Sequence, residues 1–320
     1  MRRPPLRRPL AAVLSASLVA TALTAGCVRP RAPAPAASPA PVDALPGLQQ
    51  ATDAARAHPT FDSYFYHGKA ELNRYNLQQS RYGQSHRGDA VLIFVTEDFL
   101  RTRQVKFEGH GDPRDAVPVL KLNAYRRFYT GVYPYTVMTS IFAPVRPSLQ
   151  PALKLTFSAT EWCGQVFTQL NRRDDGLHAQ SRSYFEAEGD RDDTLPHTTL
   201  EDELFIHIRR DPASLPVGPL TLLPALLHLR FDHRPLAPVP AQATLDPARD
   251  GQRSYHIAYS SGRTVDITFE SGHPHRILSW RESQPGQPTT TAQLAQSILL
   301  PYWEKHGSDD SVYRRALGLD

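Results

Sequence analysis

Residues 254–280 read SYHIAYSSGRTVDITFESGHPHRILSW, and the spacing of their apolar side chains indicates antiparallel strands. Apolar side chains occupy every second position on both sides of a Ser-Gly turn: Tyr255, Ile257, Tyr259, Val265, Ile267 and Phe269. Alternation with period two places one face of a strand on the core and the other in solvent. We therefore expect residues 254–270 to form a hairpin around Ser261-Gly262. Residues 271–274 then turn the chain into a third strand over 276–280.

The same alternation continues towards the N-terminus. Further strands are expected over the ranges 64–79, 89–97, 103–108, 117–128, 132–142, 164–171 and 180–187. Their short connections favour antiparallel pairing, because parallel strands need long crossovers. A helix is expected after residue 198 and another over 306–318, whereas three prolines in 215–229 favour an extended or looped segment. The predicted fold class is mainly β: a highly curved antiparallel sheet or open barrel with an inserted helix and a C-terminal helix.

The N-terminus has the three parts of a bacterial export signal. Four arginines within the first eight residues precede an apolar run over 10–23, which is too short to span a bilayer. The segment Leu23-Thr24-Ala25-Gly26-Cys27 then resembles the lipobox of bacterial lipoproteins, where signal peptidase II cuts before a cysteine that carries lipid. We therefore expect residues 1–26 to be a signal peptide, and we expect acylated Cys27 to bind the chain to a lipid membrane.

The composition after Cys27 predicts a tether followed by a folded domain. Residues 27–46 are rich in proline and alanine, which favour extended polyproline-like conformations and a semi-rigid tether. Residues 47–320 are expected to form a single β-rich envelope domain, with a subdivision near residue 195 as the alternative. Because Val28 replaces the aspartate that usually retains lipoproteins in the inner membrane, we expect an outer-membrane lipoprotein that faces the periplasm.

The charge of the chain argues against a nucleic-acid partner. The whole sequence has 36 basic and 32 acidic side chains, but four of the arginines lie within residues 1–26. The remainder therefore has no net charge, whereas nucleic-acid binding needs basic side chains clustered on one face.

Cys163 is the one cysteine that follows Cys27, and it lies within Glu161-Trp162-Cys163-Gly164-Gln165. One interpretation makes this thiol a nucleophile, with a histidine as base and with Glu161 or Gln165 as orienting group or oxyanion donor. The other makes it a small buried hydrophobe beside Trp162, where free cysteines commonly occur. With Cys27 acylated, neither interpretation includes an intramolecular disulfide.

Aromatic side chains cluster around a glycine and a proline in residues 129–138. Tyr129, Tyr133 and Tyr135, together with Trp162, are candidate ligand-binding residues, because aromatic rings stack on sugars and line apolar pockets. The alternative is a strand–turn–strand corner whose tyrosines pack on their neighbours.

Two pairs of histidines are candidate metal ligands. His273 and His275 flank a proline, and His228 and His233 form a second pair. No third ligand is identifiable for either pair, so we expect no metal and no other cofactor.

Several segments together resemble a family of bacterial envelope proteins often labelled "septum formation inhibitor Maf". The matching segments are 67–72 (HGKAEL), 81–83 (RYG), 91–99 (VLIFVTEDF), 131–135 (GVYPY), 161–165 (EWCGQ) and, more weakly, 302–303 (YW). The label is misleading, because true Maf proteins are α/β nucleotide pyrophosphatases with a Ser-rich opening and a Ser-Asp-Thr element, which this chain lacks. The resemblance implies a lipoprotein of unknown role and transfers no catalytic residue.

The expected function is that of a membrane-anchored envelope lipoprotein. We expect the concave face of the sheet to bind an apolar or glycan ligand, or an envelope protein. The alternative is a thiol-dependent hydrolase or transferase that uses Cys163, and the sequence favours the non-enzymatic interpretation. A histidine within hydrogen-bond reach of the Cys163 sulfur would favour the enzyme.

Overall fold

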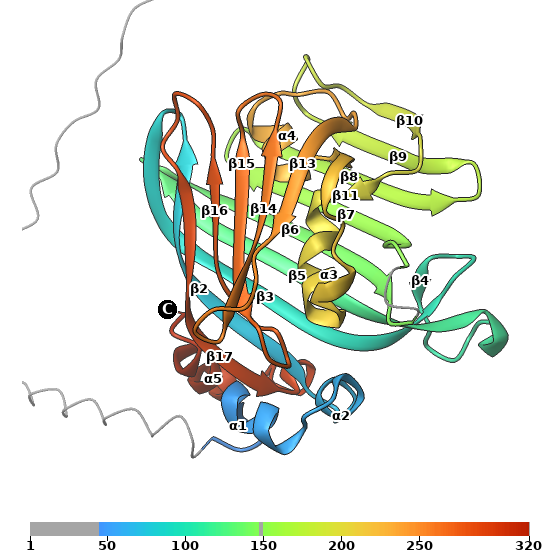
Figure 1. The fold of residues 1–320 in the computed structure, drawn as a ribbon, viewed down its shortest axis with the longest axis vertical. Coiled ribbons are helices and arrows are strands. Elements are labelled where there is room, and N and C mark those ends of the chain that lie inside the picture. The colour runs from blue at the N-terminus through green and yellow to red at the C-terminus, as the bar shows by residue number, and fades with distance from the viewer. Residues whose placement is uncertain (1–44, 147–149, 320) are drawn as a thin grey trace, which may run out of the picture. The chain divides into compact units, whose positions relative to one another are not determined.

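The computed structural model describes residues 45–146 and 150–319, and the strands of this part of the chain form one sheet (Figure 1). Its first strands are β1 (Gln49–Gln50), β2 (Ala70–Arg81), β3 (Gln84–Leu100), β4 (Val105–Lys106), β5 (Ala116–Thr130), β6 (Tyr133–Pro144), β7 (Lys154–Glu161), β8 (Gly164–Arg173), β9 (Gly176–Ser183) and β10 (Arg191–Leu195). The later strands are β11 (Thr199–Leu200), β12 (Gly218–Leu223), β13 (Val239–Leu245), β14 (Gln252–Tyr259), β15 (Thr264–Glu270), β16 (Ile277–Ser283) and β17 (Thr290–Leu300). The expected signal peptide and Cys27 lie outside the described residues.

Short helices connect or flank these strands. They are α1 (Ala51–Ala57), α2 (Phe61–Phe65), α3 (Leu204–Arg210), α4 (Leu226–Phe231) and α5 (Ser311–Ala316). The 3-10 turns are η2 (Pro113–Asp115), η3 (Glu201–Glu203), η4 (Pro212–Ser214), η5 (Tyr302–Glu304) and η6 (Ser308–Asp310). Within the two described ranges, no helix combines the length and the apolar character that crossing a bilayer requires.

Most strands pair with their neighbours in the chain, and all but one of the strand pairings of the described sheet are antiparallel. The exception is the short parallel pairing of β11 with β12. Strand β17 pairs with β2, with Leu300 opposite Ala70, and thereby joins the C-terminal half of the sheet to the N-terminal half. The hairpin expected over 254–270 is confirmed as β14 and β15, with Ile257 opposite Val265. The predicted antiparallel, mainly β fold is therefore confirmed.

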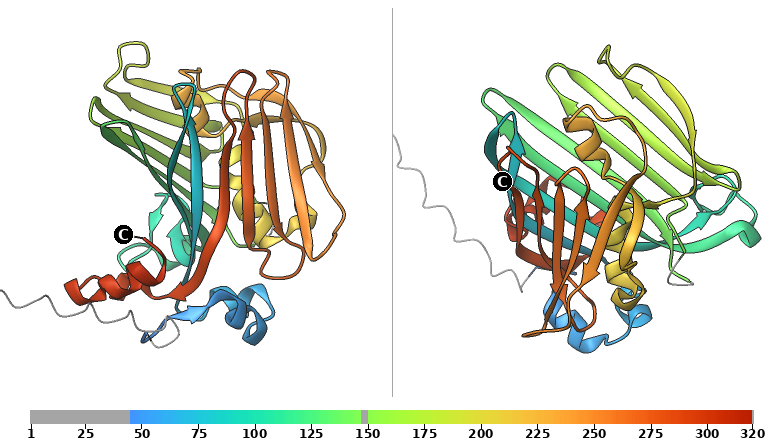
Figure 2. Two further views of the ribbon diagram at one scale, coloured as in Figure 1. Left: turned by 90° about the vertical axis from the view of Figure 1, so that its left-hand side faces the viewer. Right: turned by 45° about the horizontal axis from the view of Figure 1, so that its top comes forward.

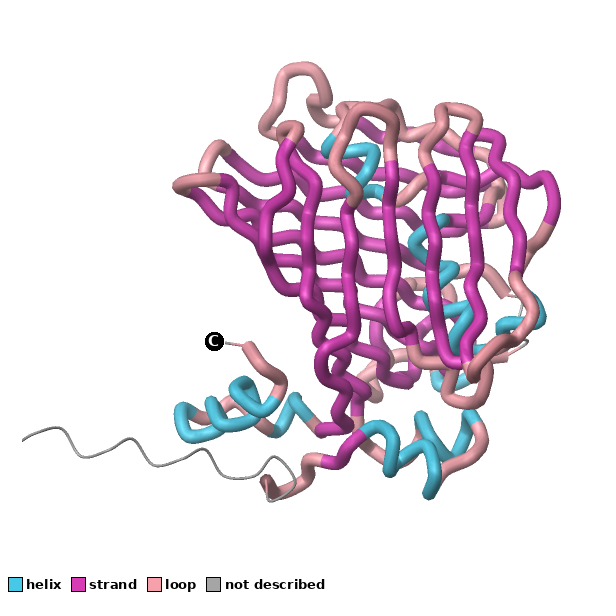
Figure 3. Tube along the Cα trace, turned by 60° about the vertical axis from the view of Figure 1, so that its left-hand side comes forward, coloured by secondary structure: helices cyan, strands magenta, loops and turns pink. Residues whose placement is uncertain are grey.

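The sheet is strongly curved and unclosed. Strand β10 pairs with β9 at one edge and β11 pairs with β12 at the other. Because the sheet curls between these edges, the strands of one half run across those of the other (Figures 2 and 3). The curvature leaves a concave side, which the core fills for the most part.

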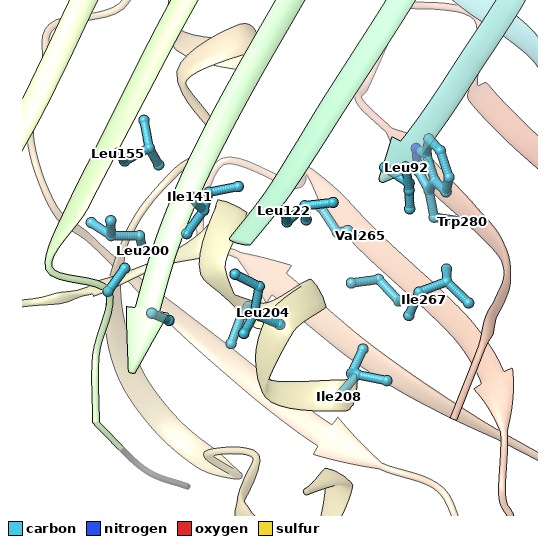
Figure 4. Close-up of a cluster of buried hydrophobic side chains, with 14 of the residues drawn as sticks. Leu92, Leu122, Ile141, Leu155, Leu200, Leu204, Ile208, Val265, Ile267 and Trp280 are labelled. Carbon is cyan, nitrogen blue, oxygen red and sulfur yellow. The ribbon is translucent and has the colours of Figure 1, made fainter. Parts of the chain in front are cut away.

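The core lies between the two halves of the sheet and includes α3. Leu122 and Ile141 come from the N-terminal half, and Val265 and Ile267 come from the C-terminal half (Figure 4). Leu204 of α3 lies among these side chains and is fully buried. The inserted helix therefore adds to the apolar burial that stabilises the curved sheet.

The structure corrects several element boundaries. The strand expected over 64–79 begins at Ala70, because Thr60 and Ser63 form a capping box that starts α2. Segment 215–229 contains β12 and the start of α4 rather than one extended piece, since its prolines all precede the helix. The strand expected over 180–187 ends at Ser183. The inserted and C-terminal helices are confirmed as α3 and α5, both shorter than expected.

One end of the strands, which we call the hairpin rim, carries most of the tight turns. It comprises the turns and loops at residues 82–83, 131–132, 162–163, 184–190, 260–263 and 284–289, together with α4. The antiparallel register places these connections at the same end, since Thr291 at the start of β17 faces Gln78 near the end of β2. The first described residues lie at the opposite end, where Gln49 of β1 pairs with Leu299.

Candidate functional site

A pocket opens at the hairpin rim between the β2–β3 turn, α4 and the β16–β17 loop. Its volume is about 290 Å³, and we call it the mouth pocket. The lining is Gln79, Ser80, Arg81, Tyr82, Gly83, Leu227, His228, Phe231, Asp232, Arg263, Glu282, Ser283, Gln284, Gln287, Pro288 and Thr290. Most of these side chains are polar, and two are aromatic.

Two buried polar atoms of the mouth pocket have no hydrogen-bond partner among the described residues: Arg81 Nε and Asp232 Oδ2. The rest of the Arg81 guanidinium is held in place, because it donates to Phe231 O at 2.6 Å and stacks on the rings of Tyr82 and Phe231. Asp232 Oδ2 lies 3.4 Å from His228 Nδ1. An unsatisfied buried polar atom costs about 1–3 kcal/mol, so both atoms favour a polar partner on this side of the pocket.

Ion pairs organise the wall behind these atoms. Arg263 binds both carboxylate oxygens of Glu201, at 2.6 and 2.7 Å, and Tyr259 donates a further hydrogen bond to Glu201. Burial disfavours the charged carboxylate, but the charge and hydrogen bonds of Arg263, together with the hydrogen bond from Tyr259, lower the pKa of Glu201. Arg126 pairs with Glu282 at 2.6 Å, and Trp280 donates to the same carboxylate. The wall is therefore charged, paired and rigid.

A second, smaller cavity lies directly behind the mouth pocket and shares Leu227 and Glu282 with it. Its volume of about 40 Å³ is far smaller than that of the mouth pocket and leaves room for only a few water molecules. Asp202 lines this inner chamber and accepts a hydrogen bond from the Leu226 N–H at 3.0 Å. Burial raises the pKa of Asp202 to about 7, so its charge changes near neutral pH.

A larger groove, of about 490 Å³, runs between β8–β10 and α4. Three of its charged groups already bind one another: Arg230 and His233 contact Glu188 at 2.8 and 3.0 Å. The mouth pocket is the stronger candidate site because a buried donor and a buried acceptor in its lining form no hydrogen bond with the described residues.

The aromatic residues singled out in the sequence lie at the hairpin rim but have different surroundings. Tyr135 is buried and stacks on Phe128 at 5.0 Å, and its hydroxyl lies 2.7 Å from that of Tyr82. Tyr129 and Trp162 are exposed, and the Tyr133 and Trp162 ring centroids are 6.3 Å apart. Tyr135 therefore supports the mouth pocket from behind, while the other three lie outside its lining.

Cys163 lies in the exposed β7–β8 turn and is not the buried side chain that one interpretation expected. Hydrogen bonding to Glu161 raises the pKa of the thiol, which lowers the fraction of reactive thiolate. Over the described ranges, no hydrogen bond joins a histidine to its sulfur. The surroundings of Cys163 therefore do not support a nucleophile.

Among the described residues, neither pair of histidines belongs to a cluster that could bind a metal ion. His228 lines the mouth pocket, and burial lowers its pKa, which favours the neutral ring. His273 packs edge-on against Tyr64, and burial lowers its pKa to about 4. Residues 45–146 and 150–319 contain no group of three or more His, Cys, Asp or Glu side chains that could hold a metal ion.

Comparison with known proteins gives one distant structural likeness. No protein-family model and no curated protein matches the chain. A crystal structure of a β-barrel-like protein of domain of unknown function DUF1849 from Brucella abortus is similar, with a TM-score of 0.44 and 10% identity. The match covers 72% of this chain and 97% of the other. At this distance the likeness carries no argument about function.

Sequence reasoning missed the residues that build the mouth pocket. Arg81 and Asp232 are separated by about 150 positions, and although Arg81 belongs to segment 81–83 of the family resemblance, no local pattern pairs it with Asp232. A polar run at 283–290 beside a predicted strand was the available signal, but it indicates a loop as readily as a binding site.

Proposed function

We propose that this chain is a membrane-anchored envelope lipoprotein that binds a small, hydroxyl-rich ligand of the glycan class in the mouth pocket. The observation that carries the proposal is that two buried polar atoms at one cavity, Arg81 Nε and Asp232 Oδ2, form no hydrogen bond with the described residues. A sugar hydroxyl both donates and accepts, so one ligand can satisfy the arginine donor and the carboxylate acceptor.

The lining favours a glycan over an apolar ligand. Amide and hydroxyl side chains from Gln79, Gln284 and Thr290 surround the pocket and supply hydrogen-bond donors and acceptors. The inner chamber is far smaller than the mouth pocket, and its lining includes Arg126, Asp202 and Glu282, which disfavour an acyl chain. The volume of the mouth pocket suits a mono- or disaccharide, because it lies at the lower limit of common ligand sites.

The binding experiment compares wild-type protein with Arg81→Gln and Asp232→Asn. Isothermal titration with neutral and N-acetylated hexoses and their disaccharides is expected to find a ligand, and each variant is expected to bind it roughly tenfold more weakly or worse. Arg281→Ala is the matched control, because Arg281 is an exposed arginine of β16 that does not line the pocket. Unaltered affinity in both pocket variants, or binding of a fluorescent fatty acid in place of every sugar, would contradict the proposal.

Acylation of Cys27 is the other part of the proposed function. Mass spectrometry of the protein extracted from membranes is expected to find a diacylglyceryl-modified N-terminal peptide that starts at Cys27. The variant Cys27→Ser is expected to leave the membrane fraction, because it lacks the thiol that carries the acyl chains. Unmodified Met1 on soluble cytosolic protein would contradict this part independently of sugar binding.

A further inference from the structure

Exposed aromatic and apolar side chains occupy four successive connections of the hairpin rim. Tyr82 is 58% exposed in the β2–β3 turn, Val132 is 78% exposed in the β5–β6 turn, Trp162 is 69% exposed in the β7–β8 turn, and Tyr184 is 71% exposed after β9. We call these four residues the aromatic tips. Large apolar side chains with this exposure mark an interaction surface when they gather in one place.

Contacts between neighbouring turns show that the aromatic tips lie along one rim. The Tyr82 hydroxyl binds that of Tyr135, whose ring lies 5.8 Å from Tyr133, and Tyr133 in turn lies 6.3 Å from Trp162. The Tyr184 ring covers Gly164 so closely that a Cβ atom there would lie 2.8 Å from it. The aromatic tips therefore follow the rim from β2 to β9.

We propose that the aromatic tips insert into the interfacial layer of the lipid bilayer to which the chain is anchored. Tyrosine and tryptophan concentrate at membrane interfaces, because each ring pairs an apolar body with a polar tip. The rings lie on projecting turns rather than on a flat face, which suits insertion between lipid headgroups. The inference rests on the acylation of Cys27 proposed above.

The length of chain before the described residues permits this contact. The rim lies one strand away from the first described residues, and the 12 residues of β2 span about 40 Å. Residues 28–44 separate Cys27 from Leu45, and seventeen extended residues reach about 56 Å. The lipid on Cys27 and the aromatic tips can therefore reach the same bilayer.

The neutral net charge of the chain separates ring insertion from electrostatic attraction to the bilayer. Without residues 1–26 the chain has 32 basic and 32 acidic side chains, so it has no net attraction to anionic lipids. Ring insertion should therefore occur on zwitterionic vesicles and should persist at high salt.

The three tryptophans of the chain provide the test. Trp162 lies on the aromatic tips, Trp303 is 46% exposed beyond the other end of β17, and Trp280 is buried. The mature lipidated protein with Trp303→Phe is reconstituted in phosphatidylcholine vesicles with plain or brominated acyl chains. Bromine quenches tryptophan at short range, so we expect Trp162 fluorescence to be lost in the brominated vesicles at both low and high salt.

Two further variants make the result specific. With both Trp162→Phe and Trp303→Phe, only Trp280 remains, and no quenching is expected. Val132→Asp places a charge on a neighbouring turn and should reduce the quenching of Trp162, because a carboxylate resists burial in the interface. Quenching of Trp303 in a Trp162→Phe protein would instead place the opposite end at the bilayer and overturn the inference.

Flotation separates the two proposals. Protein that floats with the vesicles but emits equally in plain and brominated lipid retains its anchor, and this result would overturn insertion of the aromatic tips alone. Protein that neither floats nor is quenched would contradict both. Quenching that disappears at high salt would show that charge holds the rim at the bilayer and would also overturn ring insertion.

Discussion

Glu71 of β2 and Arg209 of α3 form an ion pair in which neither side chain is exposed, although 138 positions separate them. Arg209 Nη2 donates to Glu71 at 2.7 Å, and Asn73 and Tyr64 donate to the same carboxylate. Arg209 Nε donates to Pro274 O at 2.9 Å. Burial disfavours the charged carboxylate, but Arg209 and the hydrogen bonds from Tyr64 and Asn73 together lower the pKa of Glu71. This network connects the N-terminal half of the sheet, the inserted helix and the β15–β16 loop.

Removal of one member of this pair should be strongly destabilising. Arg209→Met leaves a buried carboxylate without its counter-charge, so the free energy of unfolding should fall by about 3–5 kcal/mol in urea titrations. The double variant Glu71→Gln with Arg209→Met should recover part of this loss. Arg56→Met is the control, because Arg56 pairs with Asp53 at the surface and should cost less than about 1 kcal/mol. A similar loss in the control would contradict the role assigned to burial.

Asp202→Asn should stabilise the protein in a manner that depends on pH. The pKa of Asp202 is about 7 in the folded chain, above its ordinary value of 3.8, because burial disfavours the charged form. The protonated carboxyl of Asp202 favours the folded chain. Its contribution to the free energy of unfolding is complete below pH 3.8 and is lost as the pH rises through 7. At pH 8 we expect the free energy of unfolding of the variant to exceed that of the wild type by roughly 2–4 kcal/mol. At pH 4 we expect little difference. An equal difference at both pH values would refute the titration of Asp202.

His207 should make the fold sensitive to acid. Burial, assisted by Arg210, lowers the pKa of His207 from 6.5 to about 3, so the ring stays neutral in the folded chain. The unfolded chain binds a proton below pH 6.5, and the stability is therefore present above pH 6.5 and is lost as the pH falls towards 3. Between pH 6.5 and 4.5 the free energy of unfolding of the wild type should fall, and in His207→Leu this fall should be smaller by roughly 1–3 kcal/mol. Parallel pH profiles for the two proteins would exclude this explanation.

Gly88 should be intolerant of any side chain. A Cβ atom at this position of β3 would lie 2.2 Å from Arg127 O and 2.7 Å from Phe128 Cβ on the neighbouring strand β5. Because backbone cannot yield as a side chain does, we expect Gly88→Ala to destabilise by about 1–3 kcal/mol, measured as a lower Tm and lower urea midpoint. Gly272→Ala is the matched control, since a Cβ atom there has no neighbour within 4 Å. A drop of the same size in the control would refute the steric explanation.

Local pattern predicted the strands better than the short helices. The alternation in 254–270 is a property of neighbouring residues, and it correctly placed β14 and β15. Helix α4 escaped prediction because prolines precede its six residues and its apolar run has no helical caps. Strand β17 also went unassigned, since its pairing with β2 reaches across most of the chain.

The candidate site was less accessible to sequence reasoning than the fold. Tyr129, Tyr133, Tyr135 and Trp162 were singled out by residue type, and the structure separates buried Tyr135 from exposed Trp162. The mouth pocket depends instead on Arg81 and Phe231, whose contact at 2.6 Å joins residues 150 positions apart. A local sequence pattern cannot predict a contact between residues so far apart in the chain.

The sequence by itself determined the class of the fold, its antiparallel register in the hairpins and its neutral charge, because each depends on composition or on neighbouring residues. It also predicts the lipid anchor at Cys27. Only the tertiary structure decided which turns meet at the hairpin rim, that Glu71 faces Arg209, and that Arg81 Nε and Asp232 Oδ2 lie at one cavity without a hydrogen bond to the described residues. The physical reason is that the pairing of β17 with β2 and the curvature of the sheet bring distant segments together, and these contacts arise from packing of the whole core.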